Sequence, residues 1–107
     1  MNPYTKTEDL YAAQKRIRVR NKLYVLEHLK SHPCIDCGED DPVVLDFDHL
    51  DASTKRHSIS RMTTGTHYSL KKIQEEIDKC QVLCANCHRR KTFRERGLDW
   101  KGSEEEQ

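Results

Sequence analysis

Two C-x-x-C pairs constrain this chain more than any other feature of its sequence. The pairs are Cys34 with Cys37 and Cys84 with Cys87, and residues 38–83 separate them. A two-residue spacer lets both sulfurs and the intervening backbone N–H groups face one ion, and two such pairs make a tetrahedral thiolate site. We therefore expect one structural Zn²⁺ that is bound by all four sulfurs and joins the two ends of a small domain.

Two other uses of these cysteines fit the sequence less well. A disulfide framework needs an oxidising compartment, and residues 1–10 lack the charged and apolar regions of a signal peptide. A redox C-x-x-C needs only one pair and a βαβ setting. The fifth cysteine, Cys80, is expected to be a small buried apolar residue rather than a ligand.

The composition explains why a metal is needed. Only 35% of the 107 residues are hydrophobic, whereas an ordinary globular domain has roughly 45–50%. A domain of this length buries only about 60–68% of its unfolded surface, so its apolar core is thin. No apolar run approaches the roughly 18 residues of a membrane helix. We expect a cytoplasmic protein without membrane contact, folded around a metal.

The chain divides into three parts. Residues 1–32 are predicted to form a basic helix, residues 33–97 the metal-bearing domain of α+β class, and residues 98–107 an acidic, disordered tail. The elements expected within the domain are a strand at 43–49, a loop at 52–68, a helix at 70–79, an extended piece at 81–83 and a helix at 87–96. Ser69 caps one helix and Gly97 ends the other.

The net charge of +1 hides a segregation of charge along the chain. Residues 34–51 hold acidic residues and no Lys or Arg, whereas residues 52–74 hold five cations and no acid. A metal site bordered by phosphate contacts has this pattern, and so does an ordinary surface of salt-bridged patches. The charge pattern leaves both interpretations open.

A second constellation consists of the dyad Asp48-His49 at the end of the predicted strand and of His88 directly after the last cysteine. With the two C-x-x-C pairs, the segments LDFDH (45–49) and CQVLCANCHR (80–89) resemble the HNH endonuclease superfamily. The resemblance covers about residues 33–92. It implies a ββα-metal (treble-clef-like) finger that hydrolyses DNA phosphodiester bonds. At the position of the middle Asn of the family motif this chain has Lys79.

Carried over residue by residue, the resemblance implies that Asp48 and His88 bind a catalytic divalent ion and that His49 is the general base. The four cysteines of the two C-x-x-C pairs then match the structural zinc ligands of family members that have them. An ordinary pKa near 6.5 suits a histidine to the role of general base. Two protein ligands favour Mg²⁺ or Mn²⁺ and permit Ni²⁺ or Zn²⁺.

DNA is the expected partner. Phosphate contacts are predicted for eight cations, namely Arg16, Arg18, Arg20, Lys22, Lys55, Arg56, Arg89 and Arg90. The alternative is a non-catalytic zinc-finger module that binds nucleic acid or a protein partner. In that case His49 is a satisfied buried histidine and Asp48 pairs with Arg90. The sequence leaves the DNA site and the oligomeric state open.

Overall fold

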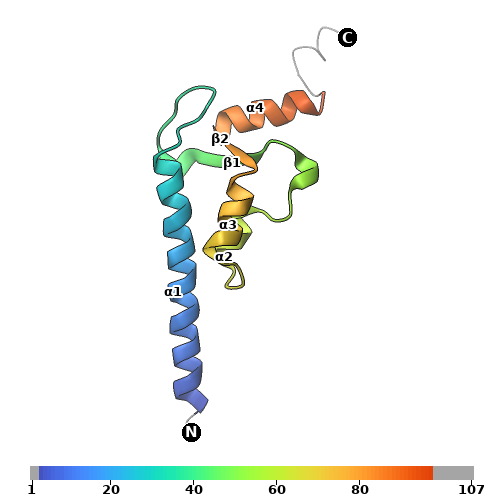
Figure 1. Cartoon of the computed structure of the whole chain (residues 1–107). Coiled ribbons are helices and arrows are strands. Elements are labelled where there is room, and N and C mark those ends of the chain that lie inside the picture. The colour runs from blue at the N-terminus through green and yellow to red at the C-terminus, as the bar shows by residue number, and fades with distance from the viewer. Residues whose placement is uncertain (1–2, 98–107) are drawn as a thin grey trace.

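The computed structural model describes residues 3–97, with side chains from residue 9 onward; the predicted tail at 98–107 lies outside them. Over these residues the fold is α+β, as predicted, with four α-helices and one two-stranded antiparallel sheet (Figure 1). In chain order the elements are α1 (Pro3–Lys30), β1 (Leu45–His49), α2 (Ile59–Thr64), α3 (Leu70–Ile77), β2 (Cys80–Cys84) and α4 (Ala85–Glu95). Among the described residues, no helix combines the length and the apolar composition needed to cross a membrane.

The long helix α1 packs on the rest of the molecule with only part of its length. Asn21 and Leu29 are buried, and Val25 packs against both apolar clusters of the core. The N-terminal end extends past α2 and α3, and Leu10 and Tyr11 are exposed there (Figure 1). The helix is confirmed, but Leu10 meets no partner in the described part of the core because the body of the domain ends short of it.

The strand begins two residues later than predicted. Pro42–Val44 form a single 3₁₀ turn that Asp41 caps by accepting the Val43 N–H at 3.0 Å. Proline favours such a start because its φ is fixed and it has no N–H to donate. The side chain of Val43 is 86% exposed. Val43 and Val44, which were predicted to begin the strand, therefore belong to a turn.

The segment 52–68 was predicted to be a loop, and this is wrong in part. It contains a short 3₁₀ turn (Ala52–Thr54) and the helix α2. Ile59 and Met62, one helical turn apart, are buried against Ile73 of α3. Two apolar residues among many polar ones gave too weak a periodic signal for a helix, although they suffice to anchor one.

The sheet connects the two clusters of the core. β1 pairs with β2 so that Leu45 faces Cys84, Asp48 faces Gln81 and His49 faces Cys80. Phe47 of β1 packs against both the cysteine-rich cluster and the α2–α3 cluster. The preceding helix α3 ends at Ile77 and not at Lys79, and Cys80 is the first residue of β2. The end of β1 is therefore held between the two clusters.

Candidate metal centres

The four cysteines of the two C-x-x-C pairs converge on one point. Their sulfur atoms all lie within 4.8 Å of one another, and the Sγ atoms of Cys37 and Cys84 are 3.6 Å apart. A tetrahedron with Zn–S bonds of about 2.3 Å has sulfur–sulfur edges of about 3.8 Å. All five cysteines are free thiols, and Cys80 stays outside the group. Cys34, Cys37, Cys84 and Cys87 could thus hold a metal ion such as zinc.

Local backbone structure fixes each pair. In the first, Gly38 has φ +81° and donates its N–H to the Cys34 carbonyl at 2.9 Å, a turn that a glycine accommodates without strain. The Ile35 N–H reaches across to the Val82 carbonyl at 3.1 Å and ties this turn to β2. In the second, Cys84 is the N-cap of α4 and accepts the Cys87 N–H at 3.4 Å. The ligands therefore stand on ordered elements.

The thiols influence one another strongly. Burial raises the pKa of Cys34, but hydrogen bonds from backbone N–H groups outweigh it and lower this pKa to about 6. Contact with Cys84, followed by burial, raises the pKa of Cys87 to about 12. One thiolate thus forms readily, whereas crowding opposes the ionisation of its neighbours. A divalent cation at the centre removes this opposition, because it is attracted to each thiolate that forms.

A second cluster lies where β1 meets the first turn of α4. His88 stands between two carboxylates, with Nε2 3.4 Å from Oδ1 of Asp48 and Nδ1 3.3 Å from Oδ2 of Asp46. The two aspartates share one face of β1 because side chains alternate along a strand. The carboxylates contact opposite nitrogens, and within the described residues only the four cysteines form a compact group of three or more ligands. The cluster therefore offers one imidazole and one carboxylate to a single ion.

Asp48 is held as an anion by neighbours that the sequence did not identify. Its Oδ2 accepts hydrogen bonds from the Lys91 ammonium and, at 2.9 Å, from the Gln81 amide across the sheet. Burial raises the pKa of Asp48, but these hydrogen bonds lower it below its ordinary value. The predicted partner Arg90 is not the one that pairs with Asp48. Lys91 lies one residue further along α4, on the side that faces the strand.

His49 lies on the opposite face of β1 from Asp48, beside α3. Its side chain is 8% exposed, and Nε2 is 2.7 Å from Oε2 of Glu76. The Glu76 side chain is only 4% exposed and also accepts a hydrogen bond from Lys79 at 2.7 Å. Burial raises the pKa of Glu76, but Lys79, His49 and the Arg56 backbone N–H lower it to about 2. Glu76 is therefore a buried anion that orients His49.

Sequence analysis missed Glu76, although the sequence contains a signal for it. Glu76 falls between Ile73 and Ile77 on the apolar face of α3, and all three are buried. An acidic residue on the apolar face of a short helix needs a partner, because an unpaired buried charge is costly. The partner itself was not predictable, because it depends on how α3 packs against the end of β1.

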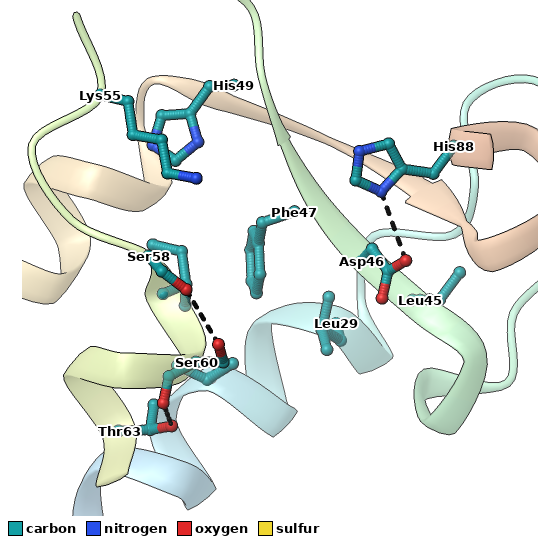
Figure 2. A pocket seen from close by; sticks show the side chains of 12 residues that line it. Leu29, Leu45, Asp46, Phe47, His49, Lys55, Ser58, Ser60, Thr63 and His88 are labelled. Atoms are coloured by element: carbon teal, nitrogen blue, oxygen red, sulfur yellow. Dashed lines mark hydrogen bonds and ion pairs between the residues drawn. The ribbon is translucent and has the colours of Figure 1, made fainter. Parts of the chain in front are cut away.

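His49 and His88 line the same cavity, although they belong to different elements and contact different carboxylates. The cavity has a volume of about 420 Å³, and its lining includes Asp46, Phe47 and Lys55 besides the two histidines. In Figure 2, His49 and Lys55 lie at one end and Asp46 with His88 at the other, with Phe47 between them. Both histidine side chains thus reach the same space, which is large enough for part of a substrate.

The eight cations predicted to contact phosphate are not gathered on one surface. Lys55 lines the cavity, and Arg89 lines an adjoining groove that also includes Asp46 and His88. Arg56 follows Lys55 on the loop, Arg90 follows Arg89 on α4, and both arginines are exposed. None of the four cations on α1 lines the cavity. Of these four, Arg16, Arg20 and Lys22 are exposed and Arg18 is half-buried.

Comparisons with protein-family models, curated proteins and solved structures find no match for this chain. Function is therefore inferred from the residues and their geometry.

Proposed function

We propose that the chain is an HNH-type endonuclease that uses a divalent ion to hydrolyse DNA phosphodiester bonds. The observation that carries this proposal is the 3.4 Å separation between Nε2 of His88 and Oδ1 of Asp48, beside a cavity that also contains His49. Two ligand atoms that are each about 2.0–2.2 Å from one ion lie no more than about 4.4 Å apart. The side chains of Asp48 and His88 meet this condition without rearrangement.

The two oxygens of Asp48 have separate tasks in this proposal. Oδ2 is occupied by Gln81 and Lys91, whereas Oδ1 faces His88. Oδ1 would therefore be the ligand atom, and oxygen ligands beside it would suit Mg²⁺ or Mn²⁺. When bound there, the ion supplies Lewis acidity to the phosphate and to the leaving oxygen.

His49 takes the proton from the attacking water. Its Nε2 is engaged by Glu76, which leaves Nδ1 as the nitrogen that accepts a proton. The buried Glu76 carboxylate stabilises the imidazolium that forms and holds the ring in place. A histidine oriented in this way through its other nitrogen is a competent general base at neutral pH.

The four-cysteine site and Lys79 support the same assignment because they hold the elements that carry the three site residues. A zinc ion held by the cysteines would fix the start of α4, and His88 follows Cys87 directly. The antiparallel pair β1 and β2 followed directly by α4 is the arrangement that a ββα-metal finger requires, and it supports this proposal. Lys79, at the position of the family's middle Asn, accepts the Leu50 N–H at 3.0 Å and donates to the Thr54 carbonyl at 2.9 Å. It thereby fixes the chain that follows the dyad.

The second candidate function is a zinc module that binds nucleic acid without cutting it. Two observations favour it: His49 is nearly buried, and Asp48 already has a cationic partner in Lys91. A module of this kind has no use for the basicity of His49. The two candidates therefore make opposite predictions for one variant.

A nicking assay separates them. We expect the zinc-loaded chain to nick supercoiled plasmid with Mg²⁺ or Mn²⁺ in a panel that includes Ni²⁺ and Zn²⁺. His49→Ala should lower the rate by about 10²–10⁴-fold, the usual contribution of a general base, with zinc content unchanged. His67→Ala is the matched control, because His67 is exposed and outside the cavity. A His49→Ala variant that nicks as fast as the control overturns the catalytic assignment.

A further inference from the structure

The segment between the dyad and α3 forms a second pocket. Its volume is about 540 Å³, within the usual range for pockets that bind small groups. The lining contains cations, hydroxyl groups and no acidic residue: Lys55, Arg56, His57, Ser58, Arg61 and Tyr68. The whole stretch 52–74 lacks Asp and Glu. The lining therefore carries three full positive charges, on Lys55, Arg56 and Arg61, and no carboxylate.

The charges in this pocket lack internal compensation. Within the part of the chain that the structure describes, Lys55, Arg56 and Arg61 form no ion pair with a carboxylate. Cations gathered without a counter-charge repel one another, and an anion among them relieves this repulsion. Beside them the Tyr68 hydroxyl lies 3.5 Å from Nδ1 of His57. Guanidinium groups with hydroxyl donors are the set that binds phosphate oxygens.

The backbone that presents these cations is fixed on both sides. The Thr54 carbonyl, directly before Lys55, accepts a hydrogen bond from the Lys79 ammonium at 2.9 Å. Beyond the pocket, Ile59 and Met62 anchor α2 in the core. A ligand therefore meets donors whose main chain is already ordered, so that less conformational entropy is lost on binding.

The pocket adjoins the cavity of the dyad. Lys55 and Ser58 line both spaces, and Figure 2 shows the two residues on the wall of the cavity below and beside His49. We propose that this second pocket binds a backbone phosphate of the same nucleic-acid strand whose neighbouring phosphate occupies the cavity. The position relative to the cut rests on the proposed function, whereas binding in the pocket does not require catalysis.

Binding without cleavage provides the test. The full chain carrying His49→Ala is titrated, zinc-loaded and without added divalent ion, into a fluorescein-labelled 20-bp duplex at several salt concentrations. Loss of one phosphate contact lowers the salt slope by about 0.9, which corresponds to about eightfold weaker binding at 0.1 M salt. We expect this loss for Arg61→Ala and, independently, for Arg56→Ala, because both residues line the pocket.

Lys30→Ala is the matched control. It removes one positive charge from an exposed pair with Glu27 and does not line the pocket. Its dissociation constant should stay within about twofold of the parent value, since exposed ion pairs contribute little. If Arg56→Ala and Arg61→Ala bind with the same affinity and salt slope as Lys30→Ala, the proposal is overturned.

Two further arms identify the source of the phosphate and separate this proposal from the nuclease. In a series of duplexes, each member carries one neutral methylphosphonate in place of a phosphate at a different position. The member that lacks the phosphate bound in the pocket should bind more weakly than the others, and Arg61→Ala should abolish that difference. If millimolar inorganic phosphate protects against unfolding in an Arg61-dependent way while the duplex series shows no such position, a strand is not the ligand. A parent that nicks no plasmid but shows the Arg61-dependent slope supports the pocket and counts against the nuclease alone.

Discussion

The two candidate metal centres lie at the same end of α4 and differ in how completely the protein surrounds an ion. The cysteine site provides four ligands, of which Cys34, Cys84 and Cys87 are buried, and leaves no position free. The cluster around His88 provides one imidazole and one carboxylate beside an open cavity. A closed tetrahedral set suits an ion that holds a fold together, whereas an open one suits an ion that must also bind substrate.

The two sites also differ in what they require when no ion is bound. The thiols crowd one another, and contact with Cys84, followed by burial, raises the pKa of Cys87 to about 12. Asp48, in contrast, has Gln81 and Lys91 as partners. The open cluster is therefore satisfied without a metal, and the closed site is not. We expect an ion in the cysteine site to contribute to folding, and an ion in the cluster around His88 to contribute to activity alone.

The largest expected effect comes from opening the closed site. Cys37→Ser should abolish stoichiometric zinc binding and the cooperative thermal transition, because metal binding supplies folding free energy in such sites. Cys37 is the exposed member of the set, so that little packing is lost with its sulfur. Metal analysis and a circular-dichroism melt measure both effects.

Cys80→Ser makes the same chemical change outside the site. Cys80 donates its S–H to the Glu76 carbonyl at 3.3 Å, a bond that a serine hydroxyl also makes. This variant should retain one zinc per chain and melt within a few degrees of the parent. Equal melting of Cys37→Ser and Cys80→Ser would show that the four sulfurs do not stabilise the fold through a metal.

The next largest effect concerns which carboxylate serves the open cluster. Asp48→Asn should lower the nicking rate by about 10³-fold, because Lewis-acid stabilisation contributes several kcal/mol to the reaction. Asp46→Asn should lower it by about 10–100-fold, the range for a group that only orients a ligand. Both variants should keep their zinc. A larger loss for Asp46→Asn would move the ligand role from Asp48 to Asp46.

How much of this was accessible from the sequence depends on how far apart the interacting residues lie. The two cysteine pairs, the long helix and the α+β class followed from local spacing and periodicity. The partners of the dyad did not, because Gln81 reaches Asp48 through the strand register and Glu76 reaches His49 through the packing of α3. The helix α2 was missed because the burial of two apolar residues, and not a periodic pattern, decides it. The turn at 42–44 was missed because the apolar pattern hid the preference of Pro42 and the cap by Asp41.

The smallest expected effect comes from removing the charge of Lys91. This ammonium bonds to the oxygen of Asp48 that faces away from His88, and the hydrogen bond to Asp48 raises the pKa of Lys91. Lys91→Met removes the competing charge and should lower the Mg²⁺ concentration for half-maximal nicking. Two unit charges about 4 Å apart interact by about 1 kcal/mol when the screening is that of bulk water, which corresponds to about fivefold in concentration.

The control for this variant is Arg94→Met, which removes one charge from the same helix at an exposed position. Mn²⁺ binding, followed by electron paramagnetic resonance, reports affinity without relying on cleavage. We expect tighter Mn²⁺ binding for Lys91→Met and no change for Arg94→Met. Weaker binding in Lys91→Met would mean that the ammonium keeps Asp48 in position for the ion, and the open cluster would then depend on α4 for its shape as fully as the cysteine site does.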